Sequence, residues 1–224
     1  VRVDKMTINN KSHLFITLDS CRYDVFKEAN TPNMDRVGTL YKARSPSFFT
    51  FPSHKAIFAG FTPAVQGKGK WLNPKHGKLY RVVSSNMSPN PNDRNKLDGK
   101  NILHGFNKIG YLTIGTGAVR WFDPNVVTGK ELTSDFSHYK FFGEYTQAKK
   151  QIPWVINTAN STKSPVFCFI NFGETHDPYR FEGSGDSDVA AYKRMGYKEK
   201  AIKIVFDQQK KCVEFLDKQL KPII

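Results

Sequence analysis

Cysteine is scarce in this 224-residue chain, which has three, and no two of them form a Cys-x-x-Cys pair. Disulfide scaffolds and zinc ribbons both need paired thiols at short spacing, so these two classes are excluded. The expected state of Cys21, Cys168 and Cys212 is therefore the reduced thiol, which favours a cytoplasmic protein.

Long apolar runs are absent as well. A membrane-spanning helix needs about 20 consecutive apolar residues, and no segment of the chain approaches that length. Residues 1–6 contain no apolar core of a secretory signal. The sequence therefore predicts no membrane span and no signal peptide.

Acidic residues are few relative to basic ones: 20 Asp and Glu stand against 34 Lys and Arg, for a net charge of +14. Such an excess favours an acidic partner, namely a phosphate or sulfate ester, nucleic acid or an anionic membrane surface. A basic surface that serves only solubility is the alternative. Hydrophobic residues make up 39% of the chain, which excludes a disordered protein.

The pattern of apolar residues predicts a single α/β domain over residues 1–224, with a mostly parallel sheet sandwiched by helices. Short apolar runs predict strands at 13–19, 39–44, 111–119 and 165–172. Three- and four-residue spacing predicts helices at 53–60, 97–109, 144–160 and 187–220.

Several residues punctuate these elements. Thr31 and Pro32 are typical of a helix start, Pro153 is expected to kink or divide its helix, and Gly196 to break the last one. Residues 62–96, rich in Gly, Pro, Asn and Lys, predict an irregular surface excursion, and 120–140 a second irregular stretch.

Polar side chains follow the predicted strands, where ligands of an open α/β sheet bind. Asp19 ends the first strand, Thr50 precedes a helix, and Glu174 and His176 follow the strand at 165–172. Each has an ordinary alternative: Asp19 and Thr50 are also typical helix caps, and a single histidine is often solvated or bonded to backbone.

Four motifs, in order, resemble the alkaline phosphatase superfamily, in particular its sulfatase and phosphodiesterase branches. LDSCRYD at 18–24 is similar to the family's opening D-x-x-R-x-D, and TPNMD at 31–35 to the helix start that follows. TFPSH at 50–54 looks like the family's nucleophile with a proline two residues on, and ETHDPY at 174–179 like its H-x-P-Y segment. The resemblance covers residues 13–63 and 165–180.

The resemblance implies a metal-dependent hydrolase or transferase of phosphate esters with Thr50 as its nucleophile. Asp19 and Thr50 would hold a divalent cation, zinc or manganese, with calcium or magnesium as alternatives. Glu174 and His176 would be further metal ligands. Family sulfatases need Cys or Ser as nucleophile because that residue is oxidised to an aldehyde, so the threonine favours phosphorus chemistry.

The same resemblance implies an anionic small-molecule ester as substrate. Arg22, His54, Lys55 and His176 would contact its charged group, although a purely structural role stays open for His54 and Lys55. Nucleic-acid binding through the basic surface is a less favoured alternative, because the chain shows no familiar nucleic-acid motif.

One family feature is missing. The family completes its metal site with an adjacent Asp-His pair late in the chain, and this sequence contains no such pair. Three explanations stay open: the sequence is a piece of a longer enzyme, a partner chain supplies the missing ligands, or the protein has lost hydrolysis and only binds an anionic ligand. The apolar stripe of the last helix continues almost to Ile224, which favours the first.

Overall fold

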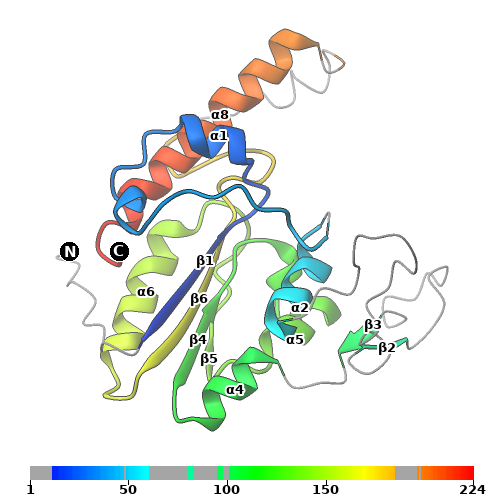
Figure 1. Cartoon of the computed structure of the whole chain (residues 1–224), viewed down its shortest axis with the longest axis vertical. Coiled ribbons are helices and arrows are strands. Elements are labelled where there is room, and N and C mark those ends of the chain that lie inside the picture. The colour runs from blue at the N-terminus through cyan, green and yellow to red at the C-terminus, as the bar shows by residue number, and fades with distance from the viewer. Residues whose placement is uncertain are drawn as a thin grey trace.

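The computed structural model describes residues 12–47, 49–60, 80–82, 95–97, 101–184, 196 and 198–224. Its main sheet contains β1 (His13–Leu18), β4 (Leu112–Thr116), β5 (His138–Tyr139) and β6 (Val166–Phe172). Within the described residues the spatial order is β1-β6-β4-β5, and every neighbouring pair is parallel. The predicted parallel sheet is thereby confirmed, and its carboxyl ends meet at one edge (Figure 1).

Helices cover both faces of this sheet, as Figure 1 shows. On one side lie α6 (Ala148–Asn160) and α8 (Glu199–Leu220), with α1 (Tyr23–Glu28) beside α8. On the other lie α2 (Thr50–Ala59), α4 (Ile102–Lys108) and α5 (Val127–Thr133). Short 3₁₀ turns, η1 (Met34–Arg36) and η2 (Arg120–Phe122), and an antiparallel pair, β2 (Tyr80–Val82) with β3 (Asn95–Leu97), complete the described elements.

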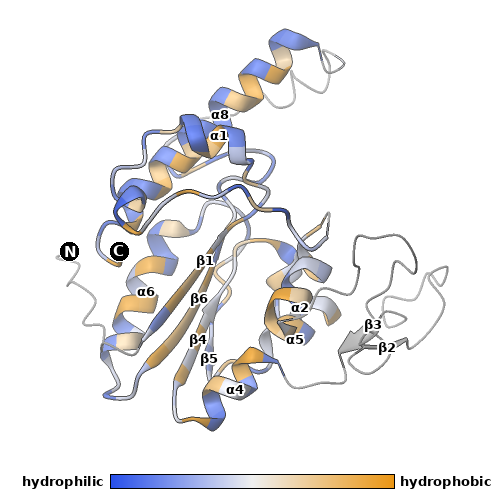
Figure 2. Cartoon of the chain, in the orientation of Figure 1, coloured by the Kyte–Doolittle hydropathy of each residue, from blue (hydrophilic) through white to orange (hydrophobic). Residues whose placement is uncertain are grey.

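The central strand β6 explains why the sheet needs cover on both faces. All seven of its residues are buried, and successive side chains enter opposite cores. Cys168 and Ile170 pack with α6 and α8, whereas Phe167 and Phe169 pack with an aromatic cluster under α2 and α4. Figure 2 shows hydrophobic residues along the strands and in stripes along α6 and α8.

The structure corrects several boundaries. The predicted strand at 39–44 is wrong: this segment is exposed coil, with Tyr41 79% exposed. The stretch 120–140 is not irregular, because it contains η2, α5 and β5. Pro153 does not divide its helix, since α6 is continuous and a buried stripe holds it against the sheet.

Other predicted segments differ from the structure or fall partly outside the described residues. The helix expected at Thr31 shrinks to the single turn η1, and α8 begins at Glu199, after Gly196 (φ 63°). Most of the expected excursion at 62–96 lies outside the described residues, as do 187–195 and 197 of the last predicted helix. The three cysteines are free thiols, and none of the described helices is long and apolar enough to cross a membrane.

Candidate active site

The first polar group of the site is Asp19, which β1 delivers to the carboxyl edge of the sheet. Its backbone N–H extends the β1–β6 pairing by donating to the Phe172 carbonyl (2.9 Å). A tight turn follows, in which Ser20 adopts φ 58° and the Cys21 N–H donates to the Leu18 carbonyl (3.2 Å). The turn directs the chain away toward α1 and leaves the Asp19 carboxylate, 6% exposed, at the sheet edge.

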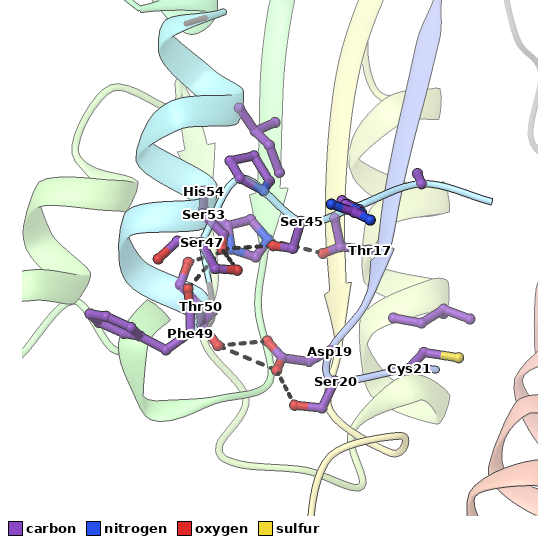
Figure 3. Close-up of a pocket in the computed structure, with 15 residues that line it drawn as sticks. Thr17, Asp19, Ser20, Cys21, Ser45, Ser47, Phe49, Thr50, Ser53 and His54 are labelled. Atoms are coloured by element: carbon purple, nitrogen blue, oxygen red, sulfur yellow. Dashed lines mark hydrogen bonds between the residues drawn. The ribbon is translucent and has the colours of Figure 1, made fainter. Parts of the chain in front are cut away.

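Thr50 faces that carboxylate. Its Oγ1 donates to Asp19, at 3.1 Å from Oδ2 and 3.3 Å from Oδ1 (Figure 3). The sequence predicted Thr50 in the loop before a helix, but α2 begins at Thr50 itself. Pro52 permits this start, because its missing N–H falls in the first turn, where no intrahelical partner exists. Because α2 begins at Thr50, the positive end of the helix is directed at the site. The first turn of α2 contains no acidic residue that would offset this positive charge.

A chain of hydrogen bonds behind the pair holds the Asp19 carboxylate and the backbone of Thr50. Asn171, fully buried at the end of β6, donates from Nδ2 to Asp19 Oδ2 (3.2 Å) and to Thr17 Oγ1 (2.9 Å). His54 Nδ1 lies 2.8 Å from the Thr50 carbonyl, and its Nε2 lies 3.3 Å from Thr17 Oγ1. Because a carbonyl only accepts, Nδ1 carries the proton and Nε2 accepts from Thr17.

Electrostatics agree with that tautomer. Burial lowers the pKa of His54, and the Thr50 carbonyl and the Asp19 charge only partly offset this effect. A neutral His54 with both nitrogens bonded to protein orients α2 rather than contacting a ligand through its ring nitrogens. The sequence analysis missed Asn171 and Thr17. Asn171 carried a signal, since it is the polar interruption of the otherwise apolar strand VFCFINF.

A cavity of about 720 Å³ opens above the Asp19–Thr50 pair (Figure 3). The end of β1 with the turn after it, the coil at 43–47 and the helix α2 form its wall. The lining residues are Thr17, Leu18, Asp19, Ser20, Cys21, Ala43, Arg44, Ser45, Pro46, Ser47, Phe49, Thr50, Ser53, His54 and Ile57. Ser53 holds the loop in place by bonding to the carbonyls of Ser47 (3.1 Å) and Phe49 (2.8 Å). Among the described lining residues, Arg44 is the permanently charged cation, and the sequence analysis missed it by assigning 39–44 to a strand.

Two predicted substrate contacts lie elsewhere. Arg22 forms an exposed pair with Asp24, with Nε 2.9 Å from Oδ1, and it is not among the residues that line the cavity. Lys55 lies on the far side of α2, where its Nζ donates to Glu131 Oε1 at 2.5 Å and lies above the Phe51 ring. The structure therefore does not bring Arg22 or Lys55 to the Asp19–Thr50 pair.

Glu174 is also separated from the pair. Its side chain enters the α6 face of the sheet, where Oε1 accepts from the Ala148 N–H (2.8 Å), the first residue of α6. Oε2 is buried and has no hydrogen-bond partner among the described residues. Burial raises the pKa of Glu174 to about 7, and backbone N–H groups, that of Ala148 first, offset only part of the rise.

His176 follows Thr175, whose Oγ1 donates to the Asp19 carbonyl (2.7 Å), in the loop after β6. Its Nδ1 is 2.6 Å from the Asp177 carbonyl, and its ring contacts Tyr145 at 5.6 Å between centroids. Burial raises the pKa of the Tyr145 phenol, with smaller contributions from the charges of Glu144, Asp177 and Asp19. His176 and Tyr145 therefore lie side by side, and neither is among the residues that line the cavity beside Asp19.

The donors available to a metal are few. Asp19 and Thr50 contribute oxygen atoms of the type that divalent cations bind, and they come from separate elements. Among the described residues, no group of three or more His, Cys, Asp or Glu side chains converges. A catalytic divalent cation usually takes three protein ligands, so the pair fits part of such a site and leaves the rest to be supplied.

No protein-family model and no curated protein sequence matches this chain. Solved structures do match. The lipoteichoic acid synthase LtaP from Listeria monocytogenes superposes with a TM-score of 0.55 at 13% identity, covering 97% of this chain and 52% of that one. A protein in the alkaline phosphatase superfamily from Vibrio parahaemolyticus gives a TM-score of 0.52 at 14% identity, covering 96% of this chain and 52% of that one.

These matches extend over nearly the whole chain, whereas the chain spans about half the length of the structures it matches. They agree with the parallel sheet covered by helices on both faces. The chain therefore has the fold of the alkaline phosphatase superfamily, and it covers about half of each of the matched structures.

Proposed function

We propose that this chain carries the nucleophile-bearing part of a metal-dependent hydrolase or transferase that acts on phosphate esters. The observation that carries the proposal is the contact between Thr50 Oγ1 and the Asp19 carboxylate, at 3.1 Å, at the floor of an open cavity. A threonine in the first turn of a helix has other uses, but a helix cap would direct its oxygen to backbone N–H groups rather than to a carboxylate.

In this proposal Thr50 Oγ loses its proton to solvent and attacks phosphorus in line, forming the Oγ–P bond as the bond to the leaving oxygen breaks and that oxygen takes a proton from water. Water or an acceptor hydroxyl then cleaves the Oγ–P bond and restores the Thr50 hydroxyl. Asp19 orients the hydroxyl by accepting its hydrogen bond, and Asn171 holds Asp19 in turn. A divalent cation held by Asp19 and Thr50 supplies, when bound, a lower pKa for the hydroxyl and neutralisation of charge on the ester. The positive end of α2 and Arg44 stabilise the charge on the other ester oxygens.

Phosphate is favoured over sulfate because of the nucleophile. The sulfatases that this chain resembles rely on an aldehyde made by oxidising Cys or Ser. Threonine would give a ketone, since its Cβ carries a methyl group. Cys21 lines the cavity but lies in the turn after Asp19, not at the start of α2, so it does not replace Thr50.

The remaining metal ligands come, in this proposal, from polypeptide outside this sequence. β1 is an edge strand of the sheet that the described residues form, and an apolar groove of about 710 Å³ lies beside it, lined by residues that include Leu14, Ile16, Leu220 and Ile223. An open edge beside apolar side chains is a typical place for a further strand to pair. A strand there would end near Asp19, because neighbouring parallel strands end at the same edge.

The nucleophile is tested by hydrolysis of bis(4-nitrophenyl) phosphate with millimolar Mn²⁺ or Zn²⁺. We expect Thr50→Val, which keeps the shape and removes the hydroxyl, to lose about 1,000-fold or more in rate, and Thr50→Ser to retain most of it. Equal rates for wild type and Thr50→Val would remove Thr50 from the mechanism. Binding of inorganic phosphate without turnover in any form would favour the non-catalytic alternative.

The cation that faces the substrate is tested with two arginines. We expect Arg44→Ala to raise KM by about tenfold, the effect of losing one partly exposed charge contact, with little change in kcat. Arg22→Ala is the matched control, because Arg22 pairs with Asp24 away from the cavity. A larger effect of Arg22→Ala than of Arg44→Ala would reverse the assignment.

A further inference from the structure

A single glutamine joins the two loops that bear the polar residues of the site. Gln209, on α8, is 2% exposed and uses both ends of its side-chain amide. Its Oε1 accepts from the Arg22 N–H (3.3 Å), while its Nε2 donates to the carbonyls of Ser20 (3.0 Å) and Thr175 (2.7 Å). One side chain therefore binds the backbone on both sides of Cys21 and, in addition, the loop after β6.

Thr175 closes the connection to Asp19. Its Oγ1 donates to the Asp19 carbonyl (2.7 Å), and its own carbonyl accepts from Gln209. The Asp19 and Ser20 carbonyls and the Arg22 N–H are thus fixed by side chains from other parts of the chain. Between them lies the Ser20 backbone at φ 58°, a conformation that serine rarely adopts without tertiary support.

We infer that Gln209 is a positioning residue, which keeps Asp19 in register with Thr50 by bridging the loops after β1 and β6. The inference deepens the proposed function, on which the importance of Asp19 rests. Gln209 itself does not line the cavity, so any effect it has on the site acts through the turn that carries Asp19.

The rest of α8 provides a contrast. Asp217, 1% exposed and two turns further on, accepts from the N–H groups of Asn33 (3.0 Å) and Met34 (2.8 Å). It anchors η1 through buried hydrogen bonds as Gln209 anchors the Asp19 turn, but none of its hydrogen bonds within the described part of the chain reaches that turn. Asp217→Asn is therefore a matched control for a buried polar anchor on the same helix.

The test uses alkylation of the native full chain by N-ethylmaleimide, with mass spectrometry to locate the label. Cys21 lies between the Ser20 carbonyl and the Arg22 N–H that Gln209 binds, so its rate of labelling reports the state of the bridged turn. Cys168 is fully buried in the core strand β6, so its labelling reports global unfolding in the same molecule.

We expect Gln209→Leu to raise the ratio of Cys21 to Cys168 labelling by about tenfold. The substitution leaves the Ser20 carbonyl and the Arg22 N–H of the turn, and the Thr175 carbonyl of the loop after β6, without the side chain that binds them. Asp217→Asn should leave the ratio within about twofold of wild type. If Gln209→Leu accelerates both cysteines equally, the glutamine serves only global stability and the inference is wrong.

A second variant separates hydrogen bonding from packing. Gln209→Glu keeps the size, and its protonated carboxyl can donate one hydrogen bond and accept another, whereas its carboxylate can only accept. We expect near-native Cys21 labelling, corrected for thiolate fraction with wild type, at pH values where the new carboxyl is protonated, and faster labelling where it is ionised. A pH-independent ratio equal to that of wild type would contradict the bridging role.

The same proteins are then titrated with Mn²⁺ by electron paramagnetic resonance. Weaker Mn²⁺ binding in Gln209→Leu than in Asp217→Asn would extend the positioning role to the metal, and equal binding would refute that extension. If wild type completed by the polypeptide that supplies the remaining ligands does not bind Mn²⁺ through Asp19, the proposed function fails, but the labelling ratio still decides whether Gln209 holds the turn.

Discussion

Two carboxylates end two neighbouring parallel strands of this sheet, and they occupy very different surroundings. Asp19 directly follows β1 and receives hydrogen bonds from the hydroxyls of Ser20 and Thr50 and from the Asn171 amide. Glu174 follows β6 by two residues and accepts from the Ala148 N–H through one oxygen, while the other is buried without a partner among the described residues.

The difference follows from the alternation of side chains along a strand. Asp19 points to the α2 face, where the cavity opens, whereas Glu174 points to the α6 face, where a helix begins. Position at the carboxyl edge of a sheet therefore does not by itself make a carboxylate a ligand. The donors that surround it and its access to solvent decide whether it holds an ion or caps a helix.

The largest expected effect tests the contrast between Asp19 and Glu174 directly. We expect Asp19→Asn to lose about 1,000-fold or more in Mn²⁺-dependent phosphodiesterase activity, because the variant loses the charge that holds the cation and orients Thr50. Glu174→Gln should change the same rate by less than about tenfold, because Glu174 does not line the cavity.

Circular dichroism at the assay temperature provides the control, since both variants must be folded for the rates to be compared. A loss in Glu174→Gln as large as that in Asp19→Asn would place Glu174 in the metal site after all. It would also imply a rearrangement of the loop after β6 when metal binds.

The sequence predicted the parallel strands β1 and β6 and the pairing of Asp19 with Thr50 at one edge of the sheet. The strands depend on local signals, namely short apolar runs bounded by polar residues, whereas the grouping of Asp19 with Thr50 depends on the resemblance to the alkaline phosphatase superfamily. The same reasoning grouped Glu174 with Asp19, because a motif fixes the order of residues but not the face of the sheet on which each side chain lies.

The missed residues share a physical reason. Gln209 is separated by 187 positions from Arg22, and Asn171 by 154 from Thr17, so their partners exist only after the sheet has assembled. Spacing on α8 placed the apolar stripe correctly but could not distinguish a buried glutamine from a solvated one. Arg44 was misplaced because an apolar-looking segment, 39–44, was assigned to a strand although no neighbour was available to pair with it.

Gly173, the residue before Glu174, lies against the backbone of two other segments, and changing it is expected to have the next largest effect. A Cβ on Gly173 would lie 2.5 Å from the Ala118 carbonyl oxygen and 2.8 Å from the Tyr145 Cα, both backbone atoms that cannot move aside singly. We expect Gly173→Ala to lower the free energy of unfolding by about 4 kcal/mol, measured by urea denaturation.

Gly105→Ala is the matched control for that substitution. Gly105 lies in α4 with nothing within 4 Å of an added Cβ, so alanine there should stabilise by about 0.5–1 kcal/mol through helix propensity. If Gly173→Ala proves as mild as Gly105→Ala, the backbone around Ala118 and Tyr145 is less tightly packed than the structure shows.

The smallest expected effect concerns pH and sharpens the comparison from the Glu174 side. Its pKa is about 7 in the folded protein and 4.5 ordinarily, so between these values the folded state holds a proton that the unfolded state has lost. Stability contributed by this group is fully present below pH 4.5 and is lost as pH rises through about 7. The pKa of His54 is lowered, so its contribution has the opposite sign and falls away in acid.

Comparing wild type with Glu174→Gln removes the contribution of His54, because that residue is present in both proteins. The difference in unfolding free energy should change by at most about 3 kcal/mol between pH 4.5 and 7, with wild type losing stability relative to the variant as pH rises. Urea midpoints measured across this range give the slope directly. A difference that does not vary with pH would mean that Glu174 ionises in the folded protein as it does in the unfolded chain, and the two carboxylates would then be more alike than their surroundings indicate.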